Sequence, residues 1–196
     1  KDPTATLSTE HFLQNPHLSV IYTLRHPCGV IASHQRLGWV GTPVHDFLRQ
    51  EPFFQRMSPE VQAVKDRNLP EIEGLAWYWR AVNEYIMQVS KQHSDVVIVE
   101  HETFSQHPEA VVRKLYEQYG IAFTPKISLE LEQLTGSQNP TDPTNNEIHV
   151  LQRNSRDNID RWKKMISQRD ERTIMKICGE TYQTLQALPN TIKIKA

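Results

Sequence analysis

The sequence predicts an α/β protein in which helices cover both faces of a parallel sheet, giving three layers. Two nearly continuous apolar runs, at 18–24 and 96–99, are typical of parallel strands buried on both faces. Between them, residues 71–92 carry apolar side chains at helical spacing, which predicts a long amphipathic helix. Strands and helices therefore alternate along the chain. We expect 18–24 and 96–100 to be parallel neighbours in one sheet, with helices 27–37 and 71–92 packed on it.

The elements before the long helix follow from turn and cap residues. Ser8 or Thr9 can cap a short helix over 10–14, which Asn15-Pro16 ends. A helix is expected to begin at Pro27, directly after the first strand. Residues 38–70 are punctuated by glycines and prolines, so they are expected to form a long irregular excursion with a helix near 59–67.

The second half of the chain is mainly helical. Pro108 opens a helix that Gly120 ends, and a last helix is expected at 169–187. Residues 135–146 are dense in Gly, Ser, Asn, Asp and Pro, which is typical of a loop. Only two strands are evident, and two are too few for the sheet of a complete doubly wound domain.

Composition narrows the class of protein. The chain has 196 residues, 38% of them hydrophobic, and a net charge of −1, so nothing in its charge favours nucleic acid as a partner. No apolar run is long enough for a membrane span, and no signal-peptide pattern or permitted glycosylation acceptor occurs, which favours a cytoplasmic protein. Cys28 and Cys178 lack the spacing of a metal site and are expected to be buried and unpaired. No metal site is predicted.

The strand-to-helix junction around Arg25 is the strongest local signal of a binding site. The apolar run ends in Arg25, Pro27 then begins a helix, and Ser33 follows Arg25 by eight positions. An arginine fork beside free N–H groups at a helix start suits an anion such as a phosphate. The alternative is an ordinary strand-to-helix turn with a surface arginine.

Four motifs together resemble sulfotransferases. The segment Arg25-His-Pro-Cys-Gly-Val-Ile-Ala-Ser33 resembles the family's 3′-phosphate-binding Arg-Asp-Pro-Arg-x-x-x-x-Ser, and Lys1-Asp-Pro3 resembles the Lys-Asp-Pro or Lys-Thr-Pro element that precedes it in tyrosylprotein and bacterial members. Val97-Ile-Val-Glu-His-Glu-Thr-Phe104 with His107-Pro-Glu109 is similar to Val-x-Tyr-Glu-Asp-Leu…Pro-Glu. Asn158-Ile-Asp-Arg-Trp-Lys-Lys164 is similar to the element ending in Arg-Trp-Arg/Lys-Lys. They occur in the family's order.

The resemblance implies a P-loop nucleotide-hydrolase-like fold and transfer of a sulfuryl group from 3′-phosphoadenosine 5′-phosphosulfate (PAPS) to a hydroxyl or amine. The product nucleotide would be 3′-phosphoadenosine 5′-phosphate (PAP), and no metal is needed. Arg25 and Ser33 match the contacts to the 3′-phosphate. Lys1 matches the lysine that stabilises the transferring group, a catalytic role, although a lysine at a chain start is often only solvated.

The basic segment 153–172 carries seven Lys or Arg against four Asp or Glu. The resemblance assigns residues 135–172 to a loop and helix start that cap the nucleotide, with Arg153, Arg156 and Arg161 as phosphate-binding candidates. A solvated charged face is the alternative. Trp162 is expected to anchor this segment in the core.

Several parts of the family's site have no match here. No Gly-rich phosphate loop occurs among the seven glycines, so residues 1–196 are expected to be the C-terminal portion of one sulfotransferase domain, incomplete at the N-terminus. The 5′-phosphosulfate loop and the general base would then lie upstream. Pro3 stands where cytosolic members place a histidine base, and His26 and His101 replace the family's Asp or Asn and Tyr, so both histidines are expected to be structural.

The acceptor side is predicted in the excursion 38–70, because aromatic loops over a rigid sheet often carry specificity. Trp39 and His45 are the candidates for contact with a small-molecule, carbohydrate or peptide acceptor; neither acceptor identity nor oligomeric state follows from the sequence. Two other functions remain open. One is a P-loop kinase-like phosphotransferase, which would require magnesium, and the other is a non-catalytic nucleotide-binding or interaction module of the same fold.

Overall fold

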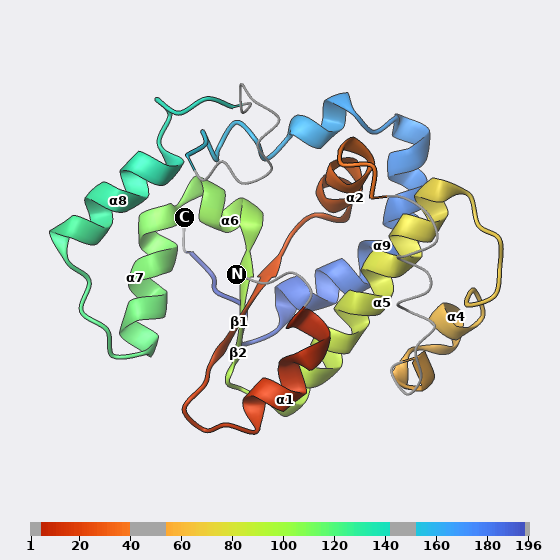
Figure 1. Cartoon of the computed structure of the whole chain (residues 1–196), viewed down its shortest axis with the longest axis horizontal. Helices are drawn as coiled ribbons and strands as arrows, with labels where there is room; N and C mark the ends of the chain where they lie inside the picture. The colour runs from red at the N-terminus through yellow and green to blue at the C-terminus, as the bar shows by residue number, and fades with distance from the viewer. Residues whose placement is uncertain (1–4, 40–53, 142–151, 195–196) are drawn as a thin grey trace.

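The computed structural model describes residues 5–39, 54–141 and 152–194 (Figure 1). The elements in chain order are η1 Ala5–Ser8, α1 Thr9–Leu13, β1 Val20–Leu24, α2 Pro27–Arg36, η2 Phe54–Arg56, α4 Pro59–Gln62, α5 Glu71–Gln92, β2 Val96–Glu100, α6 His101–Gln106, α7 Pro108–Gln118, α8 Pro125–Thr135, η3 Arg161–Lys164 and α9 Gln168–Ala187. None of the helices in these ranges is long and apolar enough to cross a membrane.

The two strands pair in parallel, as the sequence predicts. Their register runs from Val20 opposite Val96 to Leu24 opposite Glu100. The C-terminal segment lies along the other edge of β2, where the Ile98 N–H donates to the Asn190 carbonyl (3.0 Å) and the Ile192 N–H donates to the Ile98 carbonyl (2.8 Å). Strand β2 therefore has backbone partners on both edges, with the ends of both strands pointing the same way (Figure 1).

One face of the sheet carries the main core. Leu24, Val96 and Ile98 pack there with apolar residues of α2, α5 and α9, the three helices that lie together on one side of the strands (Figure 1). Helices α2 and α5 occupy residues 27–36 and 71–92, so the prediction that both pack on the sheet is confirmed. Cys28 and Cys178 are buried, unpaired members of this core, also as predicted.

The described residues cover the other face over β2 and leave part of β1 exposed. Val97 and Val99 pack with Val111 of α7, so β2 is buried on both faces. Strand β1 differs, because Ile21 is 47% exposed on the same face. The expectation that 18–24 is buried on both faces is therefore wrong within the described residues, since α7 lies over β2 and not over β1. The result is an α/β arrangement with a small parallel sheet.

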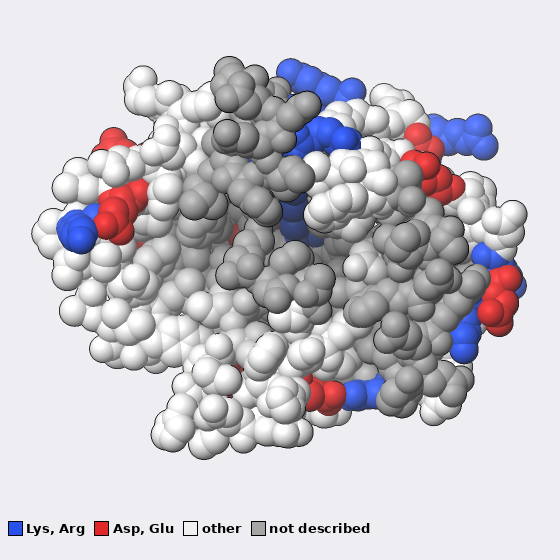
Figure 2. All heavy atoms as spheres, in the orientation of Figure 1, with Lys and Arg blue, Asp and Glu red and all other residues white. Residues whose placement is uncertain are grey.

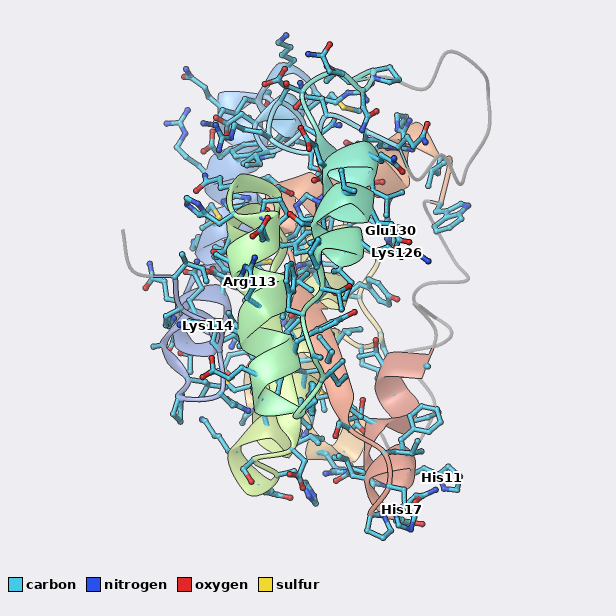
Figure 3. The ribbon with its side chains drawn as sticks, turned by 90° about the vertical axis from the view of Figure 1, so that its left-hand side faces the viewer. His11, His17, Arg113, Lys114, Lys126 and Glu130 are labelled. Carbon is cyan, nitrogen blue, oxygen red and sulfur yellow. The ribbon has the colours of Figure 1, made fainter. Side chains whose placement is uncertain are left out.

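Two helices were not expected from the sequence. Helix α6 has only six residues and begins directly after β2, and α8 begins at Pro125 after Thr124. The helix expected at 59–67 is shorter, because α4 ends at Gln62. Helix α8 lies beside α7, which carries Arg113 on its outer surface (Figure 3).

A buried ionic network holds the segment around α4 on α5. The Glu84 carboxylate accepts hydrogen bonds from the Ser58 N–H (3.1 Å), from the Ser58 hydroxyl (2.9 Å) and from Nε of Arg80 (2.7 Å). Ser58 also caps α4, since its hydroxyl accepts from the Val61 N–H (3.4 Å). Every carboxylate oxygen of Glu84 therefore has a donor, which offsets the cost of burying its charge.

Candidate functional site

Arg25 lies where β1 ends and α2 is about to begin. Strand β1 ends at Leu24, opposite the last residue of β2, so Arg25 stands at the shared carboxyl edge of the two parallel strands. This edge is where open α/β sheets bind their ligands. The Arg25 side chain is partly buried, and burial together with the charges of Arg153 and Arg36 lowers its pKa, whereas the charge of Glu102 raises it. An arginine remains protonated under these conditions, so the site holds a poorly solvated cation.

The start of α2 does not offer the free N–H groups that the sequence suggests. Pro27 has no N–H, the Cys28 N–H donates to Nδ1 of His26 (3.3 Å), and the Gly29 N–H donates to the His26 carbonyl (2.9 Å). His26 thus caps the helix with its side chain, a role usually taken by a short polar residue. The first turn of α2 is satisfied within the protein, so that expectation is wrong.

A pocket of about 140 Å³ instead opens along the flank of α2. Its lining residues come from the ends of the strands, from α2 and from the segment before α9. They are Arg25, Gly29, Ala32, Ser33, Arg36, His101, Arg153, Ser155, Asn158, Arg161, Trp162 and Met165. Four of these, Arg25, Ser33, Arg153 and Arg161, are residues that the sequence predicts to bind the nucleotide.

Several residues that line the pocket are not among those predicted from the sequence. Arg36 follows Ser33 by three positions and so reaches the same flank of α2, a spacing that could have indicated it. Ser155 and Asn158 lie in an irregular segment, where no periodicity shows which side chains point inward. Gly29 is recognisable only from the packing, because a Cβ atom there would lie 3.1 Å from Nε of Arg25. The glycine leaves room for the arginine to lie across the helix.

The segment 153–158 is held in place by α8 and the residues that follow it. The Arg153 N–H donates to the Leu134 carbonyl (3.0 Å), and the Ser155 N–H donates to the Thr135 carbonyl (3.3 Å). Asn154 is buried and bonds to Asp157 with its amide group (2.7 Å). These bonds bring a distant part of the chain against α2 and complete the pocket.

Trp162 lines the pocket and is also anchored in the main core. It is 7% exposed, packs in the main core as predicted, and stacks on the His26 ring with centroids 4.7 Å apart. The His26 ring also meets Tyr182 of α9 edge-on (5.3 Å). His26 is therefore structural, as expected. Burial lowers its pKa, which keeps the ring neutral and able to accept the Cys28 N–H.

The pocket is strongly cationic. Among the described residues that line it, four are arginines and none is acidic. Figure 2 shows Lys and Arg side chains gathered at the end of the molecule where α2 and the segment before α9 meet. Guanidinium groups bind phosphate and sulfate oxygens through paired N–H donors, and Ser33 adds a neutral hydroxyl. This arrangement suits a multiply charged anion such as a phosphate monoester.

The other predicted site residues lie elsewhere. Arg156 is outside the pocket and donates to the Gln106 carbonyl (3.0 Å), in the lining of a neighbouring cavity of about 610 Å³ beside α7 and α8. Trp39 is 51% exposed just after α2, against the His34 ring (5.9 Å), and it does not line the pocket. Lys1 and His45 lie outside the described residues. Within the described ranges, no cluster of three or more His, Cys, Asp or Glu could hold a metal ion.

Comparison with known proteins gives one match. The family model described as a sulfotransferase domain matches residues 4–186. No curated protein and no solved structure matches the chain. The matched region contains β1, α2 and β2. It also contains every residue that lines the pocket around Arg25, Arg36, Arg153 and Arg161, hereafter the arginine pocket. Because the match covers far more than half of the chain, this protein belongs to the sulfotransferase family, whose chemistry is the transfer of a sulfuryl group.

Proposed function

We propose that the protein transfers a sulfuryl group from PAPS to a hydroxyl or amine, and that the arginine pocket binds the 3′-phosphate of the nucleotide. The observation that carries this proposal is the convergence of Arg25, Ser33, Arg153 and Arg161 on one pocket at the carboxyl edge of the strands. These residues come from two regions more than a hundred positions apart. The first region resembles the family's 3′-phosphate-binding motif, and the second lies in the segment that the resemblance assigns to the nucleotide cap.

The charges around the pocket fit a dianionic phosphate group. Arg25 would donate two N–H groups to the phosphate, and the Ser33 hydroxyl would donate one more hydrogen bond. Arg153 and Arg161 would add positive charge from the opposite wall of the pocket. Binding there would hold the nucleotide while its other end, the phosphosulfate, faces the acceptor. Arg156 and Lys1 remain part of the proposal as contacts to the nucleotide and to the transferring group, on the resemblance alone.

In the proposed reaction the acceptor oxygen or nitrogen forms a bond to sulfur as the bond from sulfur to the bridging phosphate oxygen breaks. PAP leaves with that electron pair, and the acceptor proton passes to a base. Cationic side chains favour this step because negative charge builds on the leaving phosphate.

Calorimetric titration of PAP into the protein, without magnesium, tests the proposal. The parent is expected to bind, and Arg25→Ala should weaken binding by about 1.5–3 kcal/mol, the range for a hydrogen bond to a charged group. Arg113→Ala is the control, because Arg113 lies on the outer surface of α7 and its loss changes the net charge by the same amount (Figure 3). Equal affinity of Arg25→Ala and the parent would refute the assignment.

The same titrations separate the two other candidate functions. A magnesium requirement, with preference for a nucleoside triphosphate, would indicate a phosphotransferase. Binding of PAP without transfer from PAPS to any of a panel of phenols, alcohols, amines and sugars would indicate a binding module.

The acceptor is proposed to meet residues 38–70, with Trp39 or His45 nearest the transferring sulfur. The exposed indole of Trp39, held against His34 at the end of α2, supports a contact role for that residue. Exchanging 38–70 for the corresponding segment of a relative should change acceptor preference and leave PAP affinity unchanged. Unchanged preference in a folded exchange variant would exclude this segment.

A further inference from the structure

Glu102 links the ends of the two strands. It lies in the first turn of α6, directly after β2, and its Oε1 accepts a hydrogen bond from the His26 N–H (3.0 Å). That N–H belongs to the peptide group that joins Arg25 to His26. The carboxylate therefore restrains the backbone from which the Arg25 side chain extends, across 76 positions of sequence.

Burial of the Glu102 carboxylate at this position costs free energy of folding. Its side chain is only 19% exposed, and its second oxygen, Oε2, is buried with no hydrogen-bond partner among the described residues. Burial raises the pKa of Glu102, and the charge of Arg25 acts in the opposite direction. An unsatisfied carboxylate oxygen lowers stability, so packing alone does not explain a glutamate at this position.

The electrostatics of the pocket supply an explanation. Arg25 stands among the like charges of Arg36 and Arg153, which repel it, and Glu102 opposes that repulsion. A guanidinium under such repulsion would gain by turning toward water. The Arg25 side chain can lie across α2 because Gly29 has no Cβ atom to crowd it.

We infer that Glu102 is a positioning residue for the phosphate site and acts through Arg25: it holds the peptide after Arg25 and keeps the guanidinium directed into the pocket before an anion binds. This inference rests on the proposed function, because the ligand it serves is the 3′-phosphate. Glu102 is not among the residues that line the pocket, so it affects binding without touching the ligand. Holding a donor in its bound geometry lowers the cost of ordering it on binding.

A double-mutant cycle on the full chain tests the inference, with PAP affinity measured by calorimetry. Glu102→Ala should weaken PAP binding by about tenfold or more, a common effect of displacing a group that orients a binding side chain. In an Arg25→Ala background, Glu102→Ala should change the affinity less than twofold, because the residue through which it acts is gone. Adenosine 5′-phosphate, which lacks the 3′-phosphate, should bind parent and Glu102→Ala alike.

Glu100→Gln is the matched control. Glu100 lies two positions earlier, and its carboxylate bonds to Thr103 (2.9 Å) and to Gln186 rather than to the β1–α2 junction. It should leave PAP affinity unchanged. Glu102→Gln keeps an oxygen that can accept the His26 N–H, so it should recover part of the lost affinity; it also replaces alanine in the cycle if the alanine variant does not fold.

The outcomes separate this inference from the proposed function. If the parent does not bind PAP, the proposed function fails, and the positioning role for a 3′-phosphate fails with it. If the parent binds PAP and Glu102→Ala binds equally well, only the positioning role is refuted. Additive losses in the double variant, or equal losses for adenosine 5′-phosphate and PAP, would also refute it, because they indicate a general structural effect.

Discussion

The imidazole of His26 lies flat against the indole of Trp162, with centroids 4.7 Å apart and ring planes 8° apart. The two residues are far apart in the sequence, yet His26 caps α2 directly after Arg25, and Trp162 lies in η3 and lines the arginine pocket. This contact joins the two halves of the site. It also makes the stability of the fold and the geometry of the pocket depend on the same pair of rings.

Replacing Trp162 should therefore lower stability strongly. Trp162→Ala removes a buried indole from the core and should reduce the free energy of unfolding by about 3–5 kcal/mol, the usual range for a large core residue. Trp39→Ala is the control, because Trp39 is half exposed and its loss should be small. Urea denaturation measures both, and similar losses for the two variants would contradict the core role of Trp162.

Acid should weaken the cap that His26 provides. Burial lowers the folded-state pKa of His26 below its ordinary 6.5, so the unfolded chain takes up the proton first as the pH falls. The stability that the neutral ring contributes is present above pH 6.5 and is lost between 6.5 and the lower folded-state pKa. The size of the loss follows the difference between the two pKa values, at about 1.4 kcal/mol for each pKa unit.

His26→Asn isolates this effect, because asparagine caps a helix without titrating in this range. The variant is less stable than the parent at every pH, because it has lost the stack on Trp162. Its free energy of unfolding should nevertheless vary less than the parent's between about pH 7 and pH 5, the range in which histidine titrates. Equal pH dependence in parent and variant would show that His26 does not carry the effect.

Enlarging Gly29 should separate binding from stability. In Gly29→Ala the new Cβ atom would lie 3.1 Å from Nε of Arg25, so the guanidinium must move. PAP affinity should fall, but by less than in Arg25→Ala, so by less than about 1.5 kcal/mol. Helix propensity favours alanine by up to about 1 kcal/mol, so the melting temperature should be unchanged or higher. Gly179→Ala is the control, since its Cβ would meet only the flexible end of Met175 at 3.7 Å; equal PAP affinity in both variants would contradict the crowding of Arg25.

Breaking the buried Arg80–Glu84 pair should be costly. Arg80→Ala leaves the Glu84 carboxylate, 5% exposed, without its cation, and should lower the free energy of unfolding by about 3–5 kcal/mol. Lys126→Ala removes the cation of an exposed pair with Glu130, at 83% and 56% exposure, and should cost less than about 0.5 kcal/mol (Figure 3). A loss below about 1 kcal/mol for Arg80→Ala would mean that water replaces the arginine.

Local features of this protein were predictable from the sequence. The two largely apolar runs predicted β1, β2 and their parallel pairing, because short, largely apolar runs that alternate with helical segments are typical of a parallel sheet. The period of apolar residues located α5 to the residue, and Pro27 marked the start of α2. The strand-to-helix junction pointed to Arg25, and the resemblance to the family's motif added Ser33; both residues belong to one short segment, and both line the pocket.

Features that depend on distant parts of the chain were decided only by the tertiary structure. Helix α7 lies over β2 and leaves Ile21 of β1 half exposed. The His26 side chain takes the N–H of α2 that a ligand was expected to meet, because Trp162 and Tyr182 hold its ring in place. Glu102 acquires its partner across the sheet, and Ser155 and Asn158 reach the pocket through bonds from 153–155 to the end of α8. The periodicity of each element can be read from the sequence, because it arises from the backbone geometry of that element alone. The contacts between elements depend on how all of their surfaces pack at once, so no single segment encodes them.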